Sequence, residues 1–532
     1  MGKRFEILSL LSIAAAVGVF YGGSLGISFF GEIYYAFYNF LYTDDPHILT
    51  GGGGYGFRPL KGLLYYGLFN TFGLNALPFH LVHVFLHYLN AVLVFYIVAR
   101  FTENKVIGLF TALLFATSWL NCQAVCSPAV LHEVLWPFFG LLTVVCFYQF
   151  RHKGGFLYYS LSLLCLLLAL GSKENAFVLP GVLLLVDWYY RGVEWSPRGI
   201  LLDLRDGLRR GPVLALLPFF ILALIHVFIL RYSSLILDAA FGGGAQFQEL
   251  ATIERVISGL RYNMGCLFGV PIIVRRSYIV KFGIVLLILT TLVYFLSPEQ
   301  EKRRITLLMT CILILVLPVS FLLVSVHYIY LPSVGSLATL VLVFYKGSQM
   351  LGERFSAPHR RKDVMHGVFF FLCGALLVLN FRFVSNAVGY YKKLGDINRS
   401  FIEKLEASFP DPKQLRGSKL MVVNFPRVLP FPWPRYYMAW MIVYDTVDTP
   451  LAVHFGRENL PTIITVNIPL DCGKRYDKLC HLVREPAPQE YDEMVRDKDT
   501  RVYFFDSCKG AIREVTGVSY LELEKEMGER PR

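Results

Sequence analysis

The sequence predicts an α-helical polytopic membrane protein with about 11 transmembrane helices and a small C-terminal extracytoplasmic α/β domain. Of the 532 residues, 55% are hydrophobic and only 17% are charged, whereas soluble globular chains carry about 25% charged residues. This balance excludes disordered chains, collagen, coiled coils and small disulfide-bonded scaffolds. Near residue 385, short apolar runs and clustered prolines replace the long apolar stretches. We therefore divide the chain into a membrane domain over residues 1–384 and a soluble domain over residues 385–532.

Eleven apolar stretches reach or approach the length of about 20 residues that a helix needs to cross a bilayer. The first stretch lacks a convincing signal-peptidase site, so we interpret it as a retained membrane anchor. Residues 252–272 carry Arg255 and Arg261 in an otherwise apolar pattern, which is typical of an amphipathic helix in the outer membrane interface. The eleven stretches lie at roughly 6–26, 79–99, 105–121, 134–150, 155–171, 176–190, 213–230, 278–296, 305–325, 334–346 and 365–384.

The distribution of Lys and Arg orients these helices. With the N-terminus in the cytoplasm, the cytoplasmic loops contain roughly twice as many Lys and Arg residues as the outer loops, as the positive-inside rule requires. An odd number of spans then places the C-terminal domain outside the cytoplasm. The cytoplasmic loops account for most of the net charge of +12, so we expect no nucleic-acid partner.

In the soluble domain, short apolar runs bounded by turn residues predict buried strands at Leu420–Val423, Ile463–Val466 and Val502–Phe505. Phe401–Ser408 and Tyr520–Met527 are expected to be helices. This organisation is that of an α/β domain of ordinary size.

The cysteines agree with this topology. Cys122 and Cys126 share one outer loop, and three further cysteines lie in the outer domain. A disulfide between Cys472 and Cys480 would suit an oxidising compartment, although neither pair can be assigned from the sequence. Zinc binding is disfavoured because the spacings match no usual zinc motif.

Polar residues gather in the loops that this topology places outside the cytoplasm. Acids, bases and tyrosines stand at the ends of several different helices, which suggests one shared extracytoplasmic site. These residues are Asp44, Asp45, Arg58, His132, Glu133, Lys173, Glu174, Arg275, Arg276, His327, Tyr328 and Tyr330.

Each of these groups also has a purely structural interpretation. The acidic pair before Pro46 is typical of a turn. The Lys-Glu pair at 173–174 is also typical of a weak surface ion pair, and the Arg pair at 275–276 of an anchor to lipid phosphate. A single histidine more often satisfies a local hydrogen bond than performs chemistry. The glycine run at 51–54 lacks the Lys-Ser/Thr of a phosphate-binding loop and is interpreted as a hinge.

Several short motifs follow one another along most of the membrane domain: Asp44-Asp45, Phe57–Leu60, Phe72–Asn75, Phe79–His83, Leu86–Asn90, Pro128 with His132-Glu133, Ser172–Asn175 with Pro180, and Tyr328–Gly335. Their order and their side of the membrane resemble the GT-C superfamily of polytopic glycosyltransferases. The protein O-mannosyltransferase and TPR-containing O-mannosyltransferase branch is the most similar, with this chain as a bacterial-type relative without TPR repeats.

The resemblance implies a mannosyltransferase-like hexosyltransferase in a bacterial cytoplasmic (inner) membrane. Such an enzyme transfers a sugar from a polyprenyl-phosphate-linked donor, held among membrane lipids, to a hydroxyl acceptor at the extracytoplasmic face. In these enzymes an acidic residue of the first outer loop is the base, which makes Asp44 the leading candidate and Asp45 its neighbour. The sequence departs from the relatives at Val326-His327, where they carry an acidic residue followed by Arg.

The chemistry of such a reaction explains the other residues. A hydroxyl group is a poor nucleophile at neutral pH, so a carboxylate must accept its proton during an inverting displacement. The leaving lipid phosphate requires positive charge, which is supplied by Arg58, Lys173, Arg275 and Arg276. A supporting role is expected for His132, Glu133, Glu174, His327, Tyr328 and Tyr330.

A metal site is also conceivable at the first outer loop. Asp44, Asp45 and His47 offer ligands that suit Mg²⁺ or Mn²⁺. Because the outer cations already face the phosphate, we expect no metal and no required cofactor.

Two other functions remain open at this point. A transporter or flippase of lipid-linked glycans is expected to carry charges within its spans and to show paired halves, and both features are weak here. A non-catalytic scaffold that binds a partner through its outer domain is the second alternative. The sugar and the acceptor, whether protein, lipid or glycan, are not specified by the sequence.

Overall fold

A computed structural model describes residues 3–31, 33–42, 57–193, 199, 203, 205, 214–241, 253–268, 288–321, 326–355, 360–416, 418–423, 448–466, 488–497, 500–506 and 511–528. These residues are mainly helical and belong to two compact units. The first unit comprises Met1–Leu25, Leu49–Tyr65 and Pro78–Val388, and the second comprises Gly26–Ile48, Tyr66–Leu77 and Gly389–Arg532. The division of the chain at residues 384 and 385 stays a prediction.

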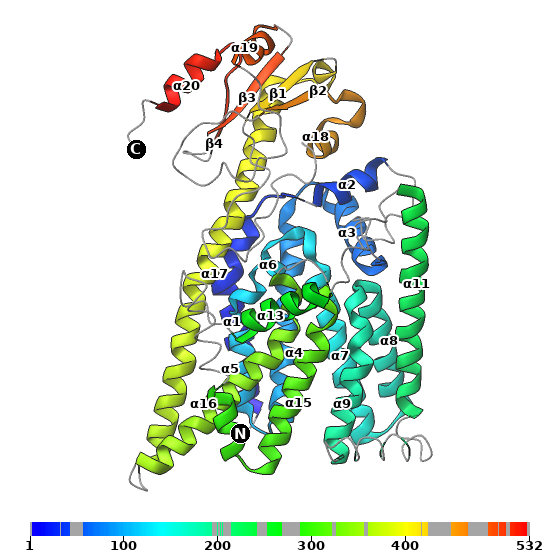
Figure 1. Ribbon diagram of the computed structural model, residues 1–532, viewed down its shortest axis with the longest axis vertical. Coiled ribbons are helices and arrows are strands. Elements are labelled where there is room, and N and C mark those ends of the chain that lie inside the picture. Colours follow the sequence, from blue (N-terminus) through cyan, green and yellow to red (C-terminus); the bar gives the residue numbers. More distant parts are fainter. Residues whose placement is uncertain are drawn as a thin grey trace. The chain divides into compact units, whose positions relative to one another are not determined.

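The first unit is a helical bundle (Figure 1). Apolar stretches that were predicted as spans are helical over most of the residues that the structure describes. The longer helices are α1 (Lys3–Tyr21), α4 (Ala76–Phe101), α5 (Lys105–Ala116), α7 (His132–Lys153), α8 (Phe156–Ser172), α9 (Leu179–Arg191), α11 (Leu217–Phe241), α15 (Glu299–Val316) and α16 (Pro332–Phe355). Shorter elements are η1 (Gly22–Gly26), η3 (Trp119–Asn121), α6 (Cys122–Cys126), η4 (Pro128–Val130), η5 (Glu174–Val178), η6 (Leu214–Leu216), η8 (Pro318–Phe321) and η9 (Val326–Ile329).

Close packing within the bundle depends on small residues at particular positions. Helix α7 packs along α8, and α15 packs along α16. A Cβ atom at Gly335 of α16 would lie 2.6 Å from Ile312 Cγ1 of α15. Only a glycine therefore permits this approach of the two helices.

Among the described residues, five helices are long and apolar enough to cross a membrane: Lys3–Gly26, Ala76–Phe101, Pro128–Lys153, Pro332–Arg354 and Lys362–Ser408. The pair Lys105–Ala116 and Trp119–Cys126, bent by 47°, would make a sixth. Phe156–Ser172 and Leu214–Ile229 are apolar but shorter. The chain is thus a helical protein with several candidate membrane spans, while the count of eleven stays a prediction.

One further segment forms the helix that the sequence predicts, and another extends beyond its predicted end. Helix α13 (Ile253–Phe268) forms where an amphipathic helix was expected, and its position in the membrane interface stays a prediction. Helix α17 (Arg361–Ser408) has 48 residues and continues through the position at which the last span was expected to end. At 1.5 Å per residue it is about 72 Å long, more than twice the hydrocarbon thickness of a bilayer. The helix expected at Phe401–Ser408 is therefore the end of α17.

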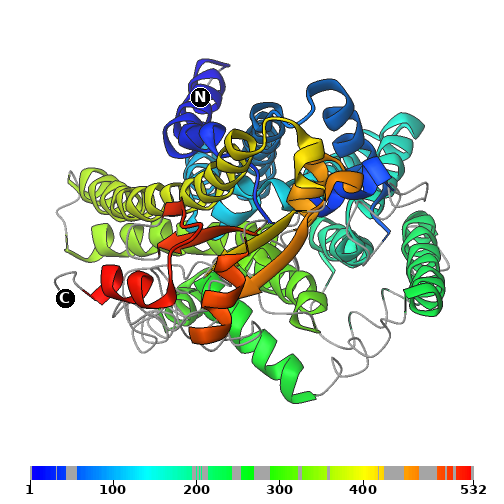
Figure 2. The ribbon, with the colours of Figure 1, turned by 90° about the horizontal axis from the view of Figure 1, so that it is seen from above.

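The second unit contains a four-stranded sheet with the order β2-β1-β3-β4. The strands are β1 (Lys419–Val423), β2 (Thr462–Val466), β3 (Thr500–Asp506) and β4 (Ala511–Glu514), and they lie side by side in Figure 2. Strands β1, β2 and β3 are parallel, and β4 is antiparallel to β3. The three predicted strands are confirmed, whereas the edge strand β4 was not predicted.

Both faces of this sheet are covered by helices. Val502 and Phe504 point into one apolar core, which also contains Tyr491 of α19 (Pro488–Arg496) and Leu523 of α20 (Tyr520–Gly528). Tyr503 points to the other face, where its hydroxyl donates to Ser408 Oγ of α17 at 2.8 Å. Helix α20 confirms the second predicted helix of this domain.

The second unit also includes a segment near the N-terminus. Helix α2 (Ile33–Tyr42) packs against α18 (Asp448–Phe455), which is followed by η11 (Arg457–Asn459). Gly395 of α17 lies so close to residue 28 that an added Cβ would sit 2.5 Å from Ser28 O. Helix α3 (Pro59–Phe72) begins in the first unit and ends in the second. Neither α2 nor α3 was predicted.

Candidate functional site

Four segments that are far apart in the sequence bring their polar side chains together in the first unit. These are the residue before α3, the start of α7, the α8–η5 junction and η9. Ion pairs and hydrogen bonds join their side chains directly. We call this group the charged cluster, and it consists of Arg58, His132, Glu133, Lys173, Glu174 and His327.

Arg58 and Glu174 form the more accessible ion pair of the charged cluster. Arg58 Nε donates to Glu174 Oε2 at 2.8 Å, and Arg58 NH2 donates to Glu174 Oε1 at 2.6 Å. This bidentate geometry fixes the guanidinium plane. Pro59 at the first position of α3 suits a helix start, so the chain turns sharply just after Arg58. The Arg58 and Glu174 side chains are 17% and 22% exposed.

Lys173 and Glu133 form the deeper ion pair. Lys173 Nζ donates to Glu133 Oε1, and both side chains are almost entirely buried. The ammonium group also lies 4.4 Å from the centre of the Tyr328 ring, which is a cation–π contact. Two histidines face the same carboxylate oxygen, with His132 Nε2 at 3.4 Å and His327 Nε2 at 3.5 Å.

Some hydrogen-bonding capacity of the charged cluster is unused. Glu133 Oε2 and His132 Nδ1 are buried, and neither atom has a hydrogen-bond partner among the described residues. Arg58 NH1 lies 3.3 Å from His132 Nε2. Buried polar atoms without partners are rare in folded proteins and are often explained by a ligand or a catalytic role.

Ion pairing and burial shift the pKa values of the cluster. Burial alone would raise the pKa of Glu174, but the charge and hydrogen bonds of Arg58 outweigh it and lower this pKa to about 2. Burial lowers the pKa of Lys173, although Glu133 and Glu174 oppose this effect. Burial, together with the charges of Lys173 and Arg58, holds the pKa of His327 well below its ordinary value. His327 is therefore neutral at pH 7.

Tyr330 belongs to a second polar network in the interior of the bundle. Its hydroxyl lies 2.7 Å from His87 Nδ1 and accepts a hydrogen bond from Asn90 Nδ2 at 3.1 Å. His87 and Asn90 were not predicted as site residues. The signal for them was present, because His80, His83, His87 and Asn90 recur every three or four residues and form one buried polar stripe on α4.

The predicted site is thus partly brought together by the structure. Arg58, His132, Glu133, Lys173, Glu174 and His327 meet in the charged cluster, and Tyr328 lies over Lys173. The catalytic candidates Asp44 and Asp45 and the phosphate-binding candidates Arg275 and Arg276 lie outside the described residues. The roles assigned to all these residues stay predictions.

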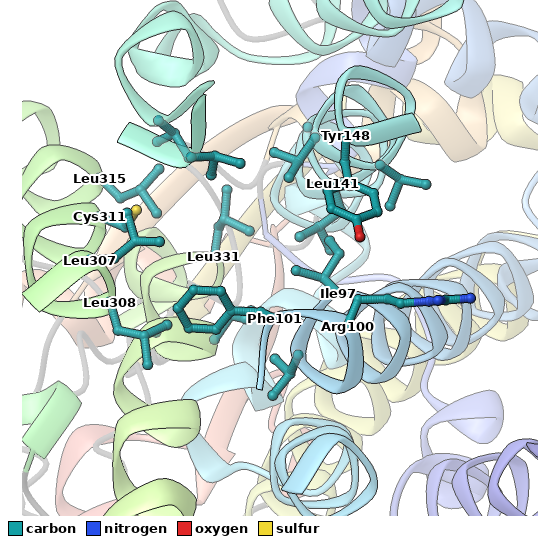
Figure 3. Close-up of a pocket in the computed structure, with 18 of the residues that line it drawn as sticks. Ile97, Arg100, Phe101, Leu141, Tyr148, Leu307, Leu308, Cys311, Leu315 and Leu331 are labelled. Atoms are coloured by element: carbon teal, nitrogen blue, oxygen red, sulfur yellow. The ribbon is translucent and has the colours of Figure 1, made fainter. Parts of the chain in front are cut away.

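An apolar cavity lies between α4, α7, α9, α15 and α16, with a volume of about 140 Å³. Figure 3 shows Leu307, Cys311 and Leu315 of α15 on one side and Ile97 of α4 and Leu141 of α7 on the other. The cavity is also lined by Leu179 and Leu331, which follow Glu174 and His327 closely in the chain. The cavity therefore lies inside the first unit, and one of its lining helices, α7, also carries two residues of the charged cluster.

Metal and thiol chemistry receive no support from the described part of the chain. It contains no group of three or more His, Cys, Asp or Glu side chains that could hold a metal ion. Cys122 and Cys126 are buried free thiols. Asp44, Asp45 and His47, named as metal ligands in the sequence analysis, and the pair Cys472 and Cys480 lie outside the described residues.

Comparison with known proteins gives a distant structural likeness. No protein-family model and no curated protein matches the sequence. The chain is similar to ArnT from Cupriavidus metallidurans bound to undecaprenyl phosphate, with 12% identity and a TM-score of 0.47 over 94% of this chain and 93% of that one. It is also similar to apo ArnT from the same organism, with 11% identity and a TM-score of 0.48 over 93% and 92%.

Proposed function

We propose that the protein is a membrane glycosyltransferase of the GT-C type, which transfers a sugar from a polyprenyl-phosphate-linked donor to a hydroxyl acceptor on the extracytoplasmic face. The single observation that carries this proposal is the charged cluster. Motifs that are widely separated in the sequence, and that resemble those of GT-C enzymes in their order, contribute five of its six side chains. The sixth, His327, stands where the sequence departs from those enzymes. A common site explains why these short motifs occur together in one chain.

The charged cluster suits a phosphate group because its cations are fixed and retain unused donors. Arg58 has five N–H donors, and its described contacts occupy three. Lys173 has three N–H donors and is held between Glu133 and the ring of Tyr328. The two carboxylates thus position the two cations before the donor arrives, and pre-positioned charges stabilise a developing phosphate more effectively than mobile ones. Arg275 and Arg276 would add positive charge.

The transfer step follows from the chemistry of the donor. The carboxylate of Asp44, or of its neighbour Asp45, takes the proton from the acceptor hydroxyl. The acceptor oxygen forms a bond to the anomeric carbon from the face opposite the phosphate, which inverts that carbon. The bond between the anomeric carbon and the phosphate oxygen breaks, and the polyprenyl phosphate leaves with the electron pair. Arg58 and Lys173 hold the negative charge that this creates.

The apolar cavity fits the lipid part of such a donor. Apolar cavities of comparable volume bind small apolar molecules rather than water. This cavity is lined mainly by aliphatic and aromatic side chains. A segment of the polyprenyl chain is the part of the donor that would occupy it. A water-soluble nucleotide sugar has no apolar chain that could bind in this cavity.

The test is transfer by purified full-length protein of sugar from a radiolabelled polyprenyl-phosphate-linked donor to a crude acceptor extract. We expect a labelled covalent product, and its loss in Asp44→Asn while the thermal unfolding midpoint is unchanged. Asp45→Asn is the matched comparison, because it removes the adjacent charge. Retained transfer in Asp44→Asn would exclude Asp44 as the base. Protein-dependent donor flipping without product would favour the transporter, and neither activity would favour the scaffold.

The same assay decides the metal question. We expect transfer to persist in the presence of a chelator, because Arg58 and Lys173 neutralise the phosphate. Activity that is lost to chelator and restored by Mn²⁺ would instead place a cation among the acids of the first outer loop.

A further inference from the structure

Asn90 of α4 joins two segments that both contribute to the charged cluster. Its amide Nδ2 donates to Val134 O at 2.8 Å and to the Tyr330 hydroxyl at 3.1 Å. Val134 directly follows Glu133 at the start of α7, and Tyr330 stands two residues after Tyr328 of η9. Asn90 is fully buried, and in the low-dielectric interior such hydrogen bonds are stronger than in water.

His87, three residues before Asn90 on α4, completes the link to Tyr330. Its Nε2 lies 3.1 Å from Ala116 O, and its Nδ1 lies 2.7 Å from the Tyr330 hydroxyl. Because a carbonyl oxygen only accepts, Nε2 carries the proton, and Nδ1 of the neutral ring accepts from Tyr330. The hydroxyl thus donates to His87 and accepts from Asn90, which fixes its position.

The two segments that Asn90 joins also supply two contacts of the Lys173 ammonium group. Glu133 accepts a hydrogen bond from Lys173 Nζ, and the Tyr328 ring centre lies 4.4 Å from the same atom. The spacing between the start of α7 and η9 therefore determines how the ammonium group is held between carboxylate and ring. An amide bonded to both segments fixes that spacing.

From these contacts we infer that Asn90 is a positioning residue, which acts with Tyr330 to fix the spacing of α7 and η9 and so directs Lys173 toward the donor phosphate. The inference rests on the proposed function for the identity of that phosphate. A displacement of about 1 Å in a charged group can reduce a rate by about 100-fold. Asn90 thus acts through Glu133 and Tyr328, not by contact with the donor.

Two substitutions break this link to different extents. Tyr330→Phe removes one hydroxyl and keeps the ring, so Asn90 retains its bond to Val134. Asn90→Leu removes both hydrogen bonds at nearly constant volume. Thr111→Val is the matched control, because it also removes a buried hydroxyl, whose hydrogen bond to Ile107 O stays within α5.

The first measurement does not depend on enzymatic activity. Full-length protein in lipid nanodiscs is treated with an acetylating succinimidyl ester, and acetylation of Lys173 is followed by mass spectrometry, with Lys105 as internal reference. The Lys173 ammonium group should react slowly in the wild type, because the Glu133 carboxylate favours its charged, unreactive form. We expect several-fold faster acetylation in Tyr330→Phe, a larger increase in Asn90→Leu, and no change in the control.

The second measurement is a double-mutant cycle on kcat/KM for transfer from the polyprenyl-phosphate-linked donor. Tyr330→Phe alone should lower kcat/KM about tenfold. Tyr328→Leu removes the ring against Lys173, so adding Tyr330→Phe to it should cost less than about twofold more, because both changes release the same group. A purely structural role of Tyr330 would make the two losses multiply.

The two readouts separate this inference from the proposed function. Unchanged acetylation of Lys173 in both variants would overturn the positioning role, and multiplying losses would exclude the route through Tyr328. Faster acetylation with unchanged kcat/KM would overturn the role in transfer. If Asn90→Leu does not fold, Tyr330→Phe decides alone. A wild-type protein without transferase activity would refute the proposed function, and the acetylation rates would still decide whether this link holds Lys173.

Discussion

Helix α7 carries an ion-pair network at each end, and the two networks differ in how fully their charges are matched. At its start, Glu133 belongs to the charged cluster. At its end, Arg151 Nε contacts Asp187 Oδ1 at 2.7 Å, which links α7 to α9. We call this second group the inner network, and it consists of Arg151, Asp187, Arg191 and Asp203. The two ends are about 27 Å apart along the helix, close to the thickness of a bilayer's hydrocarbon core.

Every carboxylate oxygen of the inner network has a partner. Arg191 Nε donates to Asp187 Oδ2 at 2.6 Å, and its two terminal nitrogens donate to both oxygens of Asp203 at 2.6 and 2.9 Å. Trp188 Nε1 also donates to Asp203 Oδ2. In the charged cluster, by contrast, Glu133 Oε2 and His132 Nδ1 lack partners among the described residues. Fully matched pairs at one end of α7 are suited to stability, whereas incompletely matched pairs at the other end are suited to binding a ligand.

Lys173→Met should have the largest effect, because it leaves the Glu133 carboxylate buried without a cation. Such a change lowers the free energy of unfolding by about 3–5 kcal/mol, and transfer should be lost. The double variant Lys173→Met/Glu133→Gln removes both charges, so most of the stability should return while transfer stays absent. Thermal unfolding in detergent and the transfer assay check both statements. A single variant that unfolds at the wild-type temperature would show that this pair is not buried as described.

Acidification should weaken the Arg58–Glu174 pair. The pKa of Glu174 is lowered from 4.5 to about 2 in the folded protein, so its stabilising effect is complete above about pH 4.5 and is lost as the pH falls toward 2. The shift corresponds to roughly 3 kcal/mol in the free energy of unfolding. Arg58→Gln removes the cause of the shift, so its dependence on pH between 2 and 4.5 should be flatter. Identical unfolding curves from pH 2.5 to 7 for both proteins would contradict this pairing.

Arg58→Lys keeps the charge but cannot form the bidentate contact with Glu174. We expect transfer to fall roughly 10- to 100-fold, because the remaining cation no longer has a fixed direction. Glu174→Gln serves as the matched variant from the other side of the pair. The measurement is kcat/KM with the lipid-linked donor, and a change of less than twofold in both variants would remove this pair from the site.

Asp203→Asn in the inner network should have the smallest effect. The amide can still accept from Trp188, and Asp203 shares Arg191 with Asp187, so the free energy of unfolding should fall by only about 1 kcal/mol. Transfer per folded molecule should not change. If this variant lost transfer as strongly as Arg58→Lys, the distinction between the two ends of α7 would be wrong.

Much of the helical fold could be predicted because apolar length alone determines it. Long runs such as Ala76–Phe101 have one stable solution in a bilayer, which is a helix. The end of α17 was misplaced because the change in composition near residue 385 marks a change of environment, and no proline or cap interrupts the helix there. Helices α2 and α3 and strand β4 were missed because they are short and depend on tertiary contacts.

The candidate site could be predicted as a set of residues and not as a set of pairs. The predicted topology placed Arg58 and Lys173 in outer loops, as cations on the same side of the membrane. Their pairing with Glu174 and Glu133 depends on how helices pack, which local sequence does not encode. The polar stripe that contains His87 and Asn90 could be predicted from the spacing of these residues on α4. The contact of this stripe with Tyr330 could not be predicted from the sequence.

Pro137 removes one backbone hydrogen bond near the start of α7. In a regular helix the N–H of residue 137 would donate to the carbonyl oxygen of Glu133, but proline has no N–H. The backbone oxygen of Glu133 therefore lacks the donor that a regular helix would supply from four residues further on. Pro137→Ala would return that donor and quench part of the local negative potential without altering any ionisable group. The backbone oxygen of Glu133 thus offers a way to change the electrostatic potential at the Lys173 ammonium group while the Glu133 carboxylate stays in place.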